Sequence, residues 1–138
     1  MSGDLQERGE ALEECYEFML AYGAQGPPSD EGSRAGGQVR EFLDRAVKVV
    51  DGLAESFAVS IQERGLDPAV NFRAFLAVPD HDARDSLAAL EMILAQPVIS
   101  SQLIDNLNAS IHLRALLTDM FLVGEIMGKQ HPVVKPRE

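Results

Sequence analysis

The chain of 138 residues contains a single cysteine and no tryptophan. One cysteine, Cys15, excludes an intramolecular disulfide and a zinc site made of several cysteines. With only six phenylalanines and two tyrosines, the core must consist mainly of leucine, alanine and valine, a composition typical of packed helices. The length fits one domain of ordinary size.

Basic residues are also scarce, with 12 lysines and arginines against 22 acidic residues and a net charge of −10. A field of this sign repels nucleic acids and anionic membranes, so we expect neither as a partner. It leaves a basic protein or a metal cation possible. The sequence has no apolar run near the roughly 18 residues of a membrane span. Its acidic start, MSGDLQERGEALEECYEF, does not resemble a signal peptide. We therefore expect a cytoplasmic protein.

Apolar residues recur at spacings of three and four through most of the chain, which predicts helices rather than strands. We predict an all-α fold, an antiparallel bundle of four main helices plus one short helix. The expected helices cover approximately residues 2–21, 38–64, 68–78, 80–96 and 100–127. The expected capping residues are Asp67, Asp80 or Asp82, and Ser100 or Ser101.

The composition divides the chain into four parts. Residues 1–23 form an N-terminal helix, for which loose docking and exchange between subunits are open alternatives to packing on its own chain. Residues 24–37 are rich in glycine, proline and charge, which predicts a flexible loop. Residues 38–128 form the core of the bundle, and residues 129–138 are a frayed tail.

The last predicted helix is apolar in every direction from Leu113 onward. A helix of this kind must be buried on all sides, and a small bundle covers about three. We expect a second copy of the chain to cover the fourth side, or a different protein that uses the same patch. The predicted apolar interface residues are Leu113, Leu116, Met120, Val123 and Met127.

Two charged residues, Arg114 and Glu125, are predicted to lie on the same side of this helix as Phe121. An unpaired charge in apolar surroundings is costly. The two residues are about 16 Å apart along a helix, so they cannot pair within one chain. In an antiparallel two-fold dimer, Arg114 would meet Glu125 of the neighbour. Alternatively, Arg114 extends into solvent, pairs with an acid of the second helix, or anchors a carboxylate or phosphate ligand.

Two acidic motifs, ECYE with Glu14 and Glu17 and EFLD with Glu41 and Asp44, lie on successive predicted helices. This pattern resembles the two-helix ExxE…ExxD site of the all-α nucleotide pyrophosphohydrolases. The resemblance implies paired carboxylates that hold Mg²⁺ against a triphosphate. Helical periodicity places all four carboxylates opposite the apolar stripes of their helices, which favours a solvated acidic face instead.

Other catalytic signals are weak. The sequence has no Ser/His/Asp arrangement, P-loop or dinucleotide-binding motif, and His81, His112 and His131 fall in different elements. Cys15 is flanked by glutamates, which oppose thiolate formation. We therefore predict a non-enzymatic helical bundle without a cofactor, which self-associates and binds protein as an adaptor or regulator. The alternatives are a Mg²⁺-dependent hydrolase and a bundle that shelters a small anionic ligand.

Overall fold

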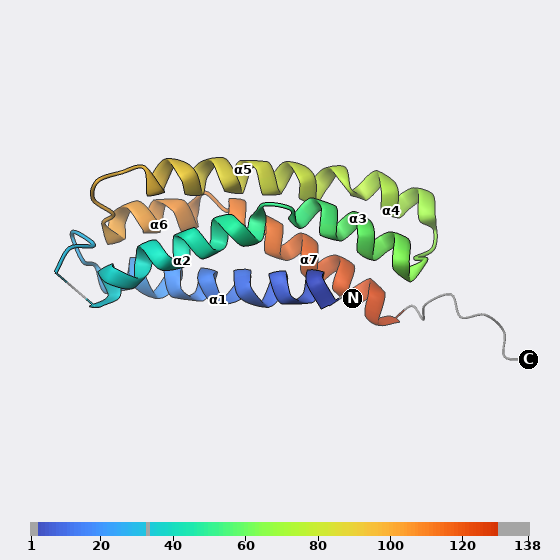
Figure 1. The fold of residues 1–138 in the computed structure, drawn as a ribbon, viewed down its shortest axis with the longest axis horizontal. Coiled ribbons are helices and arrows are strands. Elements are labelled where there is room, and N and C mark those ends of the chain that lie inside the picture. Colours follow the sequence, from blue (N-terminus) through green and yellow to red (C-terminus); the bar gives the residue numbers. More distant parts are fainter. Residues whose placement is uncertain (1–2, 33, 130–138) are drawn as a thin grey trace, which may run out of the picture.

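The computed structural model describes residues 3–32 and 34–129, which form seven helices and no strand (Figure 1). The helices are α1 (Gly3–Gln25), α2 (Arg34–Val50), α3 (Leu53–Arg64), α4 (Ala69–Phe75), α5 (Ala77–Leu94), α6 (Ser101–Ala109) and α7 (His112–Lys129). The all-α prediction is confirmed, but the number of helices differs because two predicted helices are each divided. All of the predicted tail except Lys129, including His131, lies outside the described residues.

The first division separates α2 from α3 at Gly52, whose φ of 87° no helix accommodates. The apolar periodicity continues across this break, since Val50, Leu53 and Phe57 are all buried. The end of α2 leaves carbonyl groups without helical partners. Arg8 of α1 donates from Nη1 to the carbonyls of Val49 at 2.7 Å and Asp51 at 2.8 Å. The guanidinium therefore stabilises the break and fixes α1 across it.

The second division separates α6 from α7 at Ile111, which has a φ of 62°. The predicted cap at Ser100 is confirmed, because its side chain accepts a hydrogen bond from the amide of Leu103 at 3.1 Å. The other end of α6 closes through the Ser110 hydroxyl, which donates to the carbonyl of Leu107 at 2.6 Å. Because the helix does not continue through Ile111, angular positions in α6 cannot be extended into α7.

The start of α5 also differs from the prediction. This helix begins at Ala77, and its capping position is Leu76, not Asp80 or Asp82. Pro79 lies in the first turn, where its missing N–H has no helical acceptor to lose. Asp80 instead forms an ion pair with Arg84 at 3.2 Å. The capping position of α4 is likewise Pro68 and not Asp67.

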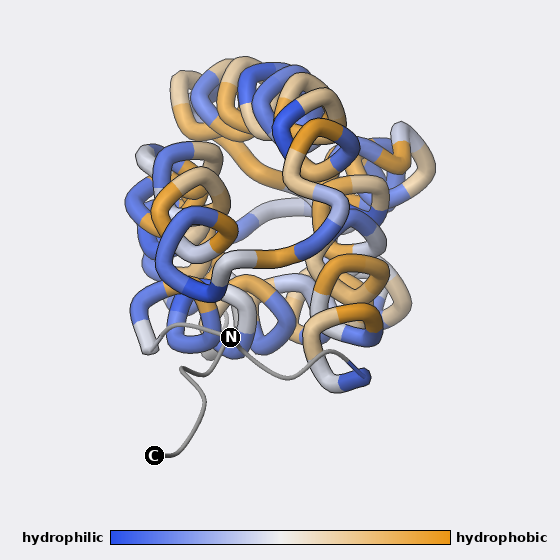
Figure 2. Tube along the Cα trace, turned by 90° about the vertical axis from the view of Figure 1, so that its right-hand side faces the viewer, coloured by the Kyte–Doolittle hydropathy of each residue, from blue (hydrophilic) through white to orange (hydrophobic). Residues whose placement is uncertain are grey.

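Helix α1 packs into the core of the chain. It packs against α2, α3, α6 and α7. Five of its side chains are at most 1% exposed, namely Leu5, Leu12, Cys15, Met19 and Tyr22. In a view along the long axis, hydrophilic segments occupy much of the outer side of the bundle (Figure 2). Residues 3–23 therefore pack in the same core as the other described helices.

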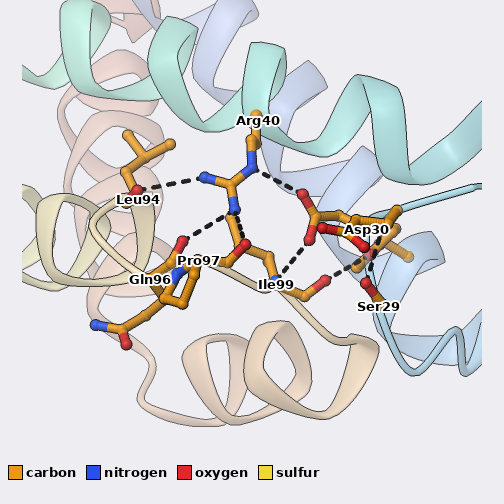
Figure 3. Close-up of polar contacts among 9 residues, drawn as sticks. Ser29, Asp30, Arg40, Leu94, Gln96, Pro97 and Ile99 are labelled. Carbon is orange, nitrogen blue, oxygen red and sulfur yellow. Dashed lines mark hydrogen bonds and ion pairs between the residues drawn. The ribbon is translucent and has the colours of Figure 1, made fainter.

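The predicted loop 24–37 is shorter than expected, because α1 extends to Gln25 and α2 begins at Arg34. It is fixed by Asp30, which accepts hydrogen bonds from Arg40 Nε at 2.7 Å and from the Ile99 amide at 2.7 Å (Figure 3). The remaining guanidinium nitrogens of Arg40 donate to the carbonyls of Leu94, Gln96 and Pro97. These contacts, the Asp30–Arg40 clamp, join the loop to the connection between α5 and α6.

Candidate functional site

The predicted interface residues of the last helix lie in the chain's own core. Leu113, Leu116, Met120, Val123 and Met127 are each at most 4% exposed. Helix α7 packs against α1, α5 and α6. We expected a second copy of the chain, or a different protein, to cover these five side chains, but the chain's own helices bury them, and α1 is one of the helices that pack against α7.

The exposed side of α7 nevertheless carries two large apolar residues. Phe121 is 55% exposed and the adjacent Leu122 is 52% exposed. Spacings of three and four place Arg114, Thr118, Phe121 and Glu125 along one line of the helix, and all four are exposed. We call these four residues together with Leu122 the α7 outer face.

The charges of the α7 outer face are solvated and not buried. Glu125 forms an ion pair with Lys129 at 3.3 Å, one turn further along the helix. Arg114 is exposed and makes no ion pair with any described residue. Arg114 borders a surface hollow of about 260 Å³, together with Ile111, Ala115, Thr118 and Asp119. The role of Arg114 as the anchor of an anionic ligand stays a prediction.

A second apolar feature lies beside the α7 outer face. It is a hollow of about 270 Å³ between α4 and α7, which we call the α4–α7 hollow. Its lining residues are Asp67, Pro68, Asn71, Phe72, Phe75, Leu122, Val123 and Ile126. This volume lies just below the roughly 300–1,000 Å³ of small-molecule sites. It is large enough for one inserted side chain. Sequence periodicity alone did not reveal it, because the contact between α4 and α7 is a tertiary one.

Two aspartates from different helices meet where α5 packs on α7. Asp119 is only 8% exposed, and its carboxyl group is in hydrogen-bonding contact with that of Asp82. Burial, followed by the hydrogen bond and the charge of Asp82, raises the pKa of Asp119 to about 8. We expected Asp80 or Asp82 as a helix cap and had no partner for Asp119, so this pair was missed. The only signal was an aspartate in the apolar run LLTDMFLV.

The four carboxylates of the predicted magnesium site do not form one. Glu14 binds Arg45 through both oxygens, at 3.0 and 3.4 Å, and the guanidinium lowers the pKa of Glu14. Glu17, Glu41 and Asp44 are exposed. Within the described ranges, no group of three or more His, Cys, Asp and Glu side chains is placed to hold a metal ion. The helices α1 and α2 pack through their apolar stripes, so most of their acids point outward.

The lone thiol is not a nucleophile at neutral pH. Cys15 is fully buried, and burial raises its pKa to about 11. A reactive cysteine needs a lowered pKa and access to solvent. Cys15 therefore serves as a small apolar residue of the core.

Comparison with known proteins assigns no family. No protein-family model, curated protein or solved structure matches this chain. None of the helices in the described part of the chain combines the length and apolar character needed to cross a membrane.

Proposed function

We propose that this protein acts without catalysis, by associating through the α7 outer face, and that its partner is a second copy of the chain. The observation that carries the proposal is the pair Phe121 and Leu122, adjacent on α7 and each more than half exposed. Among the eight aromatic residues, Phe121 is exposed, whereas the other seven are buried or half-buried. Aromatic side chains are enriched at interfaces and provide much of their binding energy.

The charges of the α7 outer face are arranged for pairing with a copy of themselves. Arg114 and Glu125 are eleven residues apart, and Thr118 and Phe121 lie between them, symmetric about the same midpoint. If two α7 helices pack antiparallel across a two-fold axis, Arg114 of each chain lies opposite Glu125 of the other. Phe121 then lies opposite Thr118, whose small side chain leaves room for the ring. This reciprocity favours a homodimer over an unrelated partner.

A second candidate is an adaptor or regulatory role, in which the same region binds a different protein. The α4–α7 hollow favours this role, because its size and its apolar walls suit one large apolar side chain of a partner. The two candidates predict different masses for the purified chain in solution, a dimer for self-association and a monomer for binding to a different protein. A chain that remains monomeric at high concentration excludes the first and leaves the second.

Removing the exposed aromatic tests the interface. Sedimentation velocity of Phe121→Ser across a concentration series should show monomer where the wild type is dimeric. Met92→Ser is the matched control, because Met92 is 62% exposed on α5, a different helix. It should leave the dimer unchanged. Equal dissociation constants for wild type and Phe121→Ser would contradict the proposed interface.

Charge exchange tests the orientation. Arg114→Glu and Glu125→Arg each place like charges opposite one another across the proposed axis, so each should weaken the dimer. The double variant Arg114→Glu/Glu125→Arg restores opposite charges and should recover it. Single variants that dimerise as the wild type does would exclude the antiparallel pairing but not association through Phe121.

A further inference from the structure

Leu122 lies on one flank of the α7 outer face, beside the line that carries Arg114, Phe121 and Glu125. A helix turns by about 100° per residue, which places Leu122 on the same flank as Ala115, seven residues earlier. Leu122 is 52% exposed, although it is a large apolar residue. In the proposed dimer, the paired charges and Phe121 lie along the line and not on this flank, so they do not cover Leu122.

The same flank contains the surface hollow of about 260 Å³ that Arg114 borders, which we call the Ala115 hollow. The side chains of Ala115 and Thr118 are short, and they leave the space open. Ile111 is 55% exposed and adds an apolar wall. Asp119 also lines the hollow, but it is only 8% exposed and contributes little polar surface. The hollow therefore suits an aliphatic side chain.

The charges of α7 determine which part of a second copy would reach this hollow. Pairing of Arg114 with Glu125 places the two-fold axis between residues 119 and 120. Such an axis between antiparallel helices brings the same flank of each helix together. Leu122 of one copy then lies at the level of residue 117 of the other copy, on the flank of its Ala115 hollow. Only two helical residues, or about 3 Å, separate this level from Ala115.

We propose that Leu122 of each copy inserts into the Ala115 hollow of the other. This inference rests on the proposed self-association and adds the residues that determine how the two copies fit. The contact joins an exposed leucine to an apolar hollow, and it forms twice because the interface is reciprocal. The opposite charges of Arg114 and Glu125 set the register that brings the two together, which favours a second copy as the occupant of the hollow.

Removing the inserted side chain tests the contact. Leu122→Ala should raise the dissociation constant of the dimer at least about tenfold in sedimentation velocity, because apolar burial is lost at both symmetric contacts. Leu20→Ala is the matched control, because Leu20 is a leucine of α1 with a similar exposure of 46%. It should leave the dissociation constant unchanged. Circular dichroism of both variants should show the helical signal of the wild type.

Cysteine cross-linking tests the register without relying on affinity. Oxidation of the double variant Ala115→Cys/Leu122→Cys should join two chains, because residue 115 of each copy lies beside residue 122 of the other. The single variants should remain unlinked. Equivalent residues lie about 14 Å apart along the helices at position 115 and about 8 Å apart at position 122, beyond the reach of a disulfide. The native Cys15 is fully buried and does not interfere.

Two results would overturn the proposal, and they have different consequences. In the first, the wild type is dimeric, but the double cysteine variant stays unlinked and Leu122→Ala has the same dissociation constant as Leu20→Ala. This result excludes the contact and retains self-association through Phe121. In the second, the wild type is monomeric up to millimolar concentration, which excludes both the dimer and the contact and leaves the Ala115 hollow to a different occupant.

Discussion

The Asp30–Arg40 clamp gives the sharpest prediction for the fold. Asp30→Ala removes two hydrogen bonds, one to Arg40 Nε and one to the Ile99 amide, both 2.7 Å long. A hydrogen bond to a charged group contributes about 1.5–3 kcal/mol. Ile99 is fully buried, so its amide would be left without an acceptor. Arg40 keeps its carbonyl partners, which limits the loss. We therefore expect the free energy of unfolding to fall by about 3–5 kcal/mol.

Urea denaturation measures this loss. With a slope of about 2 kcal/mol per molar urea, the midpoint should fall by about 2 M while the slope stays constant. Glu31→Ala is the matched control, because Glu31 is the next residue and is exposed. It should change the free energy by less than about 0.5 kcal/mol. A change of that small size for Asp30→Ala would refute the clamp as the anchor of residues 26–32.

The same clamp predicts a dependence on pH. Partial burial acts to raise the pKa of Asp30, but hydrogen bonds from the Ile99 amide and the Arg40 guanidinium outweigh it, and the pKa falls below 3.8. Because the pKa of Asp30 is lower in the folded state, its carboxylate stabilises the fold at pH values above the pKa of the unfolded chain. This contribution is lost as the pH falls through the pKa of the folded state. The difference in the free energy of unfolding between the wild type and Asp30→Ala should therefore decrease in strong acid.

Three further predictions concern other sites. The pKa of folded Asp119 is raised to about 8, so the free energy of unfolding of the wild type should fall as the pH rises from about 4 to about 8. Asp119→Asn should lack this slope in urea denaturation and be more stable at pH 7; a less stable variant would contradict the assignment. Arg8→Ala removes the donor that satisfies the end of α2 and should cost about 1–3 kcal/mol, whereas Arg84→Ala, from an exposed ion pair, should cost less than about 0.5 kcal/mol. The Cys15 thiol, buried and with its pKa raised to about 11, should react with a thiol reagent only on unfolding, and rapid labelling of the native protein would contradict its burial.

Local signals in the sequence predicted the helices better than their breaks. The cap at Ser100 was predictable, because a serine followed by apolar periodicity identifies a helix start. The break at Ile111 was not, since a non-glycine residue with positive φ leaves no mark in composition. A glycine at position 52 is compatible with a helix break, but the apolar pattern continues from Val50 to Leu53 and predicted one uninterrupted helix.

The candidate sites depend on tertiary packing, which periodicity does not provide. The sequence predicted the apolar character of α7, but it did not predict which side of α7 the other helices cover. In the structure Leu116 and Val123 are buried, whereas Phe121 is exposed. Helix capping was enough to explain an aspartate at position 82, so nothing in the sequence suggested a tertiary contact there. The contact of Asp82 with Asp119 joins two helices far apart in sequence, which no local pattern indicates.

The mass of the wild-type chain in solution tests the central claim most directly. Sedimentation equilibrium from low micromolar to millimolar concentration should give twice the mass of one chain, with dissociation to monomer on dilution. A single-chain mass throughout this range would contradict self-association through Phe121 and the α7 outer face.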